Sequence, residues 1–201
     1  MWAASANGAP VTFSTNAAGT GFAGVDLILN NSLGAVATLT FVPGVNITTG
    51  VPSNVNFGNF TLVCSTCSTQ AVGSGATFPS FTFHLVITDV TDGATGLIVG
   101  TSSGGSVFSD VSQISIIWAP LQLGPGTNQA TSGNFGPTIF TTTGFTGIVA
   151  PNSGTIPGQS TVQGFVDSVN SDDVPEPVTL GLVGSALLGL GLLGKMRLSA
   201  Q

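Results

Sequence analysis

Strict alternation of apolar and polar residues is the pattern that most limits how this chain can fold. The segment SFTFHLVIT, residues 80–88, places four large apolar residues on one face of an extended chain: Phe81, Phe83, Leu85 and Ile87. The opposite face carries Thr82, His84, Val86 and Thr88. A period of two residues predicts a half-buried β-strand, whereas an amphipathic helix needs a period near 3.6 residues. No stretch of residues 7–169 shows the helical period over a useful length.

Shorter runs of the same kind predict the other strands. Residues 37–41 (ATLTF) and 114–118 (ISIIW) alternate in the same way, and residues 24–29, 55–63, 139–149 and 161–169 are further candidates. Turn-forming dipeptides separate the runs: Pro43-Gly44, Asp92-Gly93, Gly104-Gly105, Pro125-Gly126 and Pro157-Gly158. About eight to ten strands at this spacing predict one all-β domain over residues 7–169, an antiparallel β-sandwich of the jelly-roll kind.

Charge is distributed very unevenly along the chain. Charged residues make up 5% of the 201 residues, against about 25% in an ordinary soluble domain. All eight acidic residues lie at or before Glu176, and the only two basic residues, Lys195 and Arg197, follow it. Because binding to nucleic acid needs Lys and Arg to replace the phosphate counterions, we exclude nucleic acid as a partner. The 13 Phe residues indicate a folded core and not a disordered chain.

The C-terminal region contains an apolar run that is long enough to reach across a membrane. Residues 178–194 are 17 residues without a charge, and as a helix they would rise about 26 Å. A bilayer core is about 30 Å thick, so this run is near the minimum length for a transmembrane helix. The cations Lys195 and Arg197 in the basic tail, residues 195–201, predict a cytoplasmic C-terminus and an exported body. The alternative interpretation is a buried core helix or an ordinary C-terminal anchor.

Four residues before this run carry a family resemblance. Val174-Pro175-Glu176-Pro177, an apolar helix and a short basic end together resemble the PEP-CTERM sorting signal of Gram-negative bacteria. The resemblance covers residues 174–201 and implies that Pro175, Glu176 and Pro177 are recognised by exosortase, a membrane-embedded protease or transpeptidase. It further implies transient anchoring in the inner membrane and a final location at the cell surface or in the extracellular matrix, often together with exopolysaccharide.

An exported body also needs an export signal at its N-terminus. The chain begins MWAASANGAP, which has no cationic segment and no apolar segment of the length found in signal peptides. Ala4-Ser5-Ala6 fits the A-x-A cleavage pattern. We therefore expect residues 1–6 to be the remnant of a signal peptide and residues 170–173 to be a linker before the sorting motif.

The two cysteines are expected to form a local disulfide. Cys64 and Cys67 are separated by two residues, and an exported protein meets oxidising conditions. A zinc site would need two more ligands, and the single histidine, His84, lies on a separate predicted strand. We therefore expect neither a metal site nor a cofactor.

Other reactive residues give no recognisable catalytic set. Asp89, Asp92 and Asp110 are candidate calcium ligands, although turns favour Asp for backbone reasons alone. His84 has no identifiable nucleophile or orienting acid, so we expect no enzyme activity. Trp118 is a candidate sugar platform, but its position on the apolar face favours the core.

The sequence thus predicts an exported β-domain with a structural or interaction role at the cell surface or in the matrix. Its expected partners are the exosortase-like enzyme, the inner membrane and an exopolysaccharide. The alternative function is that of a carbohydrate-binding module or adhesin. That alternative requires an exposed aromatic row or a groove lined by acids.

Overall fold

The structure is a computed structural model of the chain. It describes residues 8–18, 27–30, 35–73, 75–119, 122–125, 130–133, 135–152 and 156–169. One compact unit ends at Val169. The expected signal-peptide remnant, the linker, the sorting motif and the membrane helix all lie outside the described residues.

The described residues form antiparallel β-sheets and one short 3-10 turn, η1 (Gln70–Val72). The first sheet contains, in spatial order, β14 (Phe145–Gly147), β10 (Ser115–Trp118), β8 (Ala94–Ser102), β7 (Phe81–Asp89), β1 (Gly8–Ala18) and β4 (Ile47–Val51), with β12 (Ala130–Ser132) paired to β8. The second contains β11 (Gln122–Leu123), β13 (Thr138–Thr142), β15 (Gly158–Ser168), β5 (Ser53–Cys64), β3 (Val36–Pro43) and β2 (Leu27–Asn30). A separate two-strand ribbon pairs β6 (Ala76–Phe78) with β9 (Gly105–Val107).

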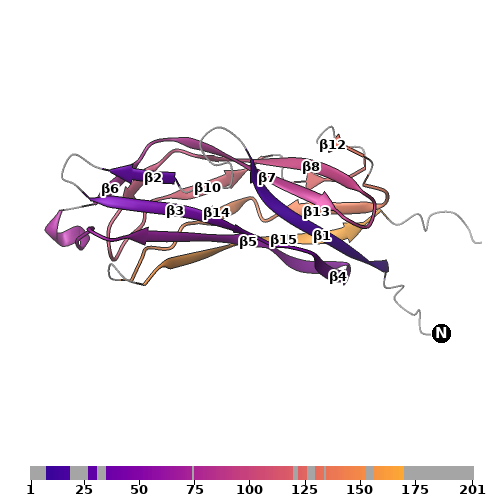
Figure 1. Cartoon of the computed structure of the whole chain (residues 1–201), viewed down its shortest axis with the longest axis horizontal. Coiled ribbons are helices and arrows are strands. Elements are labelled where there is room, and N and C mark those ends of the chain that lie inside the picture. Colours follow the sequence, from indigo (N-terminus) through magenta and orange to yellow (C-terminus); the bar gives the residue numbers. More distant parts are fainter. Residues whose placement is uncertain are drawn as a thin grey trace, which may run out of the picture. The chain divides into compact units, whose positions relative to one another are not determined.

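The two sheets curl around one shared core of aromatic and aliphatic side chains (Figure 1). Phe13 of β1 packs against Phe57 of β5 with ring centroids 5.6 Å apart, and Phe83 of β7 packs against Phe60 of β5 at 5.0 Å. Both pairs meet edge to face, the arrangement that the quadrupoles of aromatic rings favour. Each pair joins the first sheet to the second. The expectation of an all-β antiparallel fold is therefore confirmed.

The alternating segments form the strands that the sequence predicts. In β7, Phe83, Leu85 and Ile87 have no exposed surface, and the intervening residues are half-buried on the other face. In β3, Ala37, Leu39 and Phe41 are buried in the same way. Ile114, Ile116 and Trp118 face the core at β10.

Two details of the predicted pattern are wrong. Residues 139–149 are not one strand, because the chain turns at Gly144 and passes from β13 in the second sheet to β14 in the first. Gly144 has φ of 83°, a left-handed conformation that glycine adopts without a steric penalty. Pro157-Gly158 is not a turn between strands, since β15 begins at Gly158 itself.

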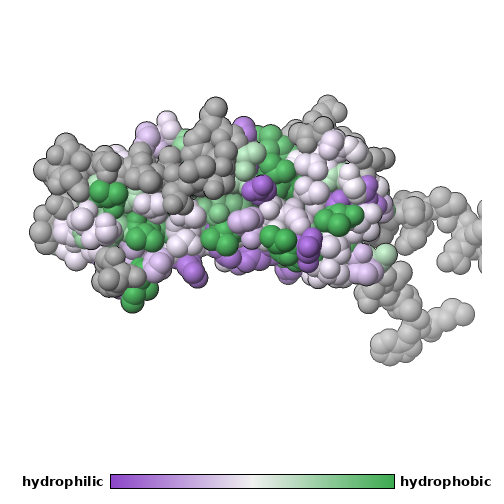
Figure 2. Space-filling view, in the orientation of Figure 1, coloured by the Kyte–Doolittle hydropathy of each residue, from purple (hydrophilic) through white to green (hydrophobic). Residues whose placement is uncertain are grey.

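The late strand β15 lies beside the early strand β5, and this pairing places the site described below. The two strands lie side by side in Figure 1. In their antiparallel register, Thr161 is opposite Asn59 and Gln163 is opposite Asn56. Figure 2 shows apolar and polar residues mixed over one face of the described part, with apolar residues scattered among polar ones. Scattered apolar residues are ordinary on folded proteins. The paired polar side chains of β5 and β15 are the more informative surface feature.

Candidate functional site

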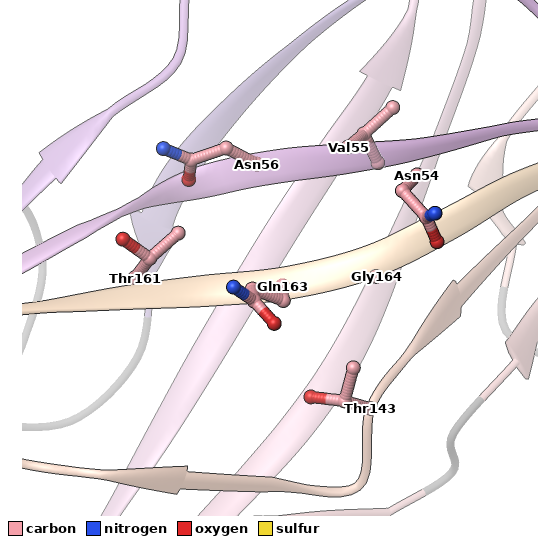
Figure 3. A pocket seen from close by; sticks show the side chains of 7 residues that line it. All are labelled: Asn54, Val55, Asn56, Thr143, Thr161, Gln163 and Gly164. Atoms are coloured by element: carbon pink, nitrogen blue, oxygen red, sulfur yellow. The ribbon is translucent and has the colours of Figure 1, made fainter.

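A shallow polar groove lies on the second sheet over β5 and β15 (Figure 3). Its lining contains amide, hydroxyl and aliphatic groups and no charged side chain: Asn54, Val55, Asn56, Thr143, Thr161, Gln163 and Gly164. We call this hollow the amide groove. The amide groove was not predictable from the sequence, because residues from opposite ends of the domain form it.

The alternation of β15 produces one side of the amide groove. Ser160, Val162, Gly164 and Val166 are buried, whereas Thr161 and Gln163 are exposed between them. The inward-facing Gly164 leaves room for Phe57, because a Cβ atom there would collide with the Phe57 ring and the Thr141 carbonyl oxygen. The buried face of β15 is thus tightly packed against the interior, and the polar face lies at the surface.

A β-bulge in β5 produces the other side. The register between the two strands shifts between Thr161 and Gln163. Two residues of β5, Phe57 and Gly58, therefore lie opposite the single residue Val162 of β15, which is the arrangement of a β-bulge. Gly58 has φ of 128°, and a Cβ atom on it would lie 2.5 Å from the Phe41 ring. The bulge buries two consecutive residues and leaves Asn56 and Asn59 both on the outer face. A Phe-Gly pair inside an otherwise alternating strand is the sequence signal that marks such a bulge.

Hydrogen bonds fix three polar residues at one end of the amide groove. The backbone N–H of Gly58 donates to Asn56 Oδ1 at 2.7 Å, and Asn56 Nδ2 donates to Asn59 Oδ1 at 3.3 Å. The Thr161 hydroxyl donates to the same Asn59 Oδ1 at 3.0 Å. These contacts use half of the hydrogen-bonding positions of the two asparagines and link them to Thr161 and to the backbone, so this end serves as a support for the groove.

The other end carries two amide groups without such contacts. The side chains of Asn54 and Gln163 are exposed, and neither makes a hydrogen bond to another described residue. Figure 3 shows these two side chains and Thr143 arranged around Gly164. Phe165, the next outward residue on β15, is opposite Asn54 and is 36% exposed. The site therefore offers free donors and acceptors next to one exposed aromatic ring.

Asp89 is a second unusual group, and it lies at the end of β7. Its side chain has no exposed surface. Its Oδ1 accepts the N–H groups of Thr91 at 2.9 Å and Asp92 at 3.2 Å. Its Oδ2 has no hydrogen-bond partner among the described residues. Burial raises the pKa of Asp89 above the ordinary carboxyl range, and this effect outweighs the hydrogen bond from the Asp92 N–H.

The three candidate calcium ligands do not come together. Asp89 and Asp92 share the turn between β7 and β8, whereas the Asp110 Oδ1 accepts the Gln70 N–H at 2.9 Å beside η1. Within the described part of the chain, no three His, Cys, Asp or Glu side chains form a group suited to a metal ion. The hydrogen bond that Asp110 accepts from Gln70 supports η1, and this structural role accounts for the acid at this position.

Trp118 and His84 take the structural positions that the sequence favoured for them. Trp118 is 1% exposed, and its Nε1 donates to the Thr146 hydroxyl at 2.9 Å, so it is a core residue and not a sugar platform. His84 is half-buried on the outer side of β7, where it is paired in register with Ala18 and Val99. Phe145 and Phe165 are the exposed aromatic residues among those described.

Cys64 and Cys67 form the expected disulfide at the end of β5. The sorting residues Pro175, Glu176 and Pro177 and the cations Lys195 and Arg197 lie outside the described residues. Among the described residues, no helix has the length and apolarity to cross a bilayer.

Comparison with known proteins adds no identification. No protein-family model, curated protein or solved structure matches this chain.

Proposed function

We propose that this protein is exported and delivered to the cell surface or extracellular matrix by an exosortase-type system. The observation that carries this proposal is the order of features at the C-terminus. A Pro-Glu-Pro motif, 17 uncharged residues and two cations follow a body that contains no lysine or arginine. Such an order suits a stop-transfer helix with its C-terminus in the cytoplasm. Proline is disfavoured inside helices and restricts the residue before it to extended backbone. We therefore propose that Glu176 is presented outside the membrane helix, where an enzyme in the membrane can reach it.

The body then has a structural or interaction role in a polysaccharide-rich matrix. We propose that its two curled sheets are a β-sandwich of the jelly-roll kind. A neutral amide groove supports an interaction role more than an enzymatic one, because amides and hydroxyls do not exchange protons as general acids or bases near neutral pH.

Carbohydrate binding is the second candidate function, and the amide groove favours it. The lining lacks the acids that one form of this hypothesis requires, but its exposed Asn54 lies opposite Phe165, an exposed phenylalanine just outside the lining. Amides both donate and accept hydrogen bonds, as sugar hydroxyls do. The groove thus supports recognition of an uncharged sugar.

The sorting proposal is tested with variants of the motif. We expect the triple variant Pro175→Ala, Glu176→Ala, Pro177→Ala to stay in the inner membrane at full length. The matched control Ser171→Ala, in the predicted linker, should reach the surface as the parent protein does. Cell fractionation and intact mass distinguish the two forms, and equal surface delivery of the triple variant would rule out recognition of the motif.

A further inference from the structure

We propose that the amide groove binds an internal segment of an uncharged polysaccharide, through the free amides of Asn54 and Gln163 and the ring of Phe165. This inference deepens the second candidate function and rests on it. It adds the chemical class of the ligand and the residues that recognise it.

The free amides determine the class of ligand. Asn54 and Gln163 lie on adjacent strands, and each presents one carbonyl acceptor and one NH2 donor to solvent. A sugar hydroxyl is also both donor and acceptor, so neighbouring hydroxyls on a ring can pair with an amide at both of its atoms. A phosphate or carboxylate ligand would instead call for Arg or Lys, and residues before Lys195 include neither.

Phe165 supplies the apolar part of the contact. Its ring is 36% exposed, and its strand neighbours in register are Asn54 on β5 and Thr141 on β13. Pyranose rings have one apolar face of C–H groups, and burial of that face against an aromatic ring removes apolar surface from water. A polar contact at Gln163 and an apolar contact at Phe165 lie two residues apart on one face of β15, within the span of a short oligosaccharide segment.

The support of the groove is rigid, which lowers the entropic cost of binding. Asn56, Asn59 and Thr161 hold one another by hydrogen bonds, and the Gly58 N–H fixes the Asn56 side chain. Val162 and Gly164 are buried on the opposite face of β15 and hold the strand against the core. A ligand therefore has few protein side chains to immobilise beyond Asn54 and Gln163.

The shape of the groove favours a polymer over a free monosaccharide. Its volume is about 460 Å³, and it lies open on the face of the sheet. It is within the range of about 300–1,000 Å³ that small-ligand sites occupy, but no wall closes over a bound sugar. An open site of this kind binds weakly alone, and many copies on one surface would bind a repeating polymer by avidity.

The test measures binding of the full chain, held in detergent, to soluble polysaccharides by affinity electrophoresis. Dextran and galactomannan are the neutral probes, and alginate is the anionic one. We expect retardation by at least one neutral probe and none by alginate, because the acidic body repels a polyanion. Retardation should not change between about 50 and 500 mM salt, since no ion pair contributes.

Paired variants locate the site. Gln163→Ala should weaken binding about two- to tenfold, the loss expected for one or two neutral hydrogen bonds. Gln159→Ala removes the same side chain from the same exposed face of β15 outside the groove, and it should bind as the parent does. Phe165→Ala should weaken binding, whereas Val90→Ala, at an exposed apolar residue in the turn between β7 and β8 of the first sheet, should not.

Each outcome decides the inference. Thermal unfolding of every variant confirms that the domain still folds, and Gln163→Glu offers a second change of nearly constant size that removes the NH2 donors. The inference is overturned if no neutral probe binds, if alginate binds best, or if Gln163→Ala and Gln159→Ala weaken binding equally. None of these results affects the sorting proposal, because surface delivery is measured separately with the variants of the Pro-Glu-Pro motif.

Discussion

Asp89 places a carboxyl group inside a domain whose described residues include no lysine or arginine to neutralise it. The sequence indicated a turn at this point, and the two N–H groups that Asp89 accepts agree with that reading. Its burial follows strand periodicity, because Asp89 continues the inward face of β7 after Ile87. The turn signal alone did not indicate this burial. The turn after β7 holds Asp89 at this inward position through the N–H groups of Thr91 and Asp92.

The raised pKa of Asp89 gives the domain a defined pH dependence. Between the ordinary carboxyl pKa and the raised value, the folded state holds a proton that the unfolded chain has lost. The free energy of unfolding therefore falls as pH rises through this window. We expect Asp89→Asn to remove this fall, while the carbonyl oxygen of Asn keeps both N–H contacts.

The measurement is the urea midpoint of both proteins from about pH 3.5 to 7. The advantage of Asp89→Asn over the parent should grow with pH. Asp167→Asn removes a carboxylate from β15 and is the matched control for the loss of one acidic side chain. A parent protein that instead gains stability relative to Asp89→Asn as pH rises would show that Asp89 folds in its ionised form.

Gly164 illustrates how the interior determines the surface of the amide groove. We expect Gly164→Ala to destabilise the domain by about 1–3 kcal/mol, because the new methyl group overlaps the Phe57 ring and the Thr141 backbone. Gly50→Ala, in β4, is the control, since a Cβ atom there meets nothing within 4 Å. Equal urea midpoints for the two variants would contradict this account of the packing.

At the scale of elements, alternation predicted some long strands, such as β7 and β3, but not all of them. The strands β1, with 11 residues, and β8, with 9 residues, were not among the predicted strands. Segments such as β7 and β3 repeat their pattern often enough for the period of two to be recognised. Strands of two or three residues, such as β11 and β14, carry too few residues to show any period. The bulge at Phe57-Gly58 and the turn at Gly144 depend on backbone conformations that only their glycines indicate.

The amide groove escaped prediction for a related reason. Its residues are ordinary Asn, Gln and Thr, which are common throughout the chain, so composition does not distinguish them. Only the pairing of β5 with β15 brings Asn56 and Gln163 together. Strand order is a property of tertiary packing, and a single sequence does not reveal it.

The disulfide at the end of β5 gives a prediction at the same scale. Because Cys64 and Cys67 close a loop of only four residues, the chain-entropy model gives a stabilisation of roughly 2 kcal/mol. We expect the unfolded but unreduced protein to take up no thiol-alkylating reagent and the reduced protein to take up two equivalents. Reduction should lower the thermal midpoint only modestly. Alkylation without reductant would show that the pair is not oxidised in the exported protein.

At the scale of the whole molecule, the acidic and basic residues are separated along the sequence. The acidic, cation-free body and the basic end are divided by the Pro-Glu-Pro motif and an apolar run. A surface made polar by amides and hydroxyls suits contact with neutral polymers, whose binding does not depend on salt. The sorting proposal and the proposed ligand are therefore both supported by a body that contains no Lys or Arg, although each has its own test.

The most direct test of the central claim is the intact mass and C-terminal sequence of the protein recovered from the cell surface. The account predicts a chain that ends near Pro175-Glu176-Pro177 and lacks Lys195 and Arg197, and it predicts the full tail on protein from cells without the sorting enzyme. A protein that is found in the cytosol, with its sequence intact to Gln201, would contradict it.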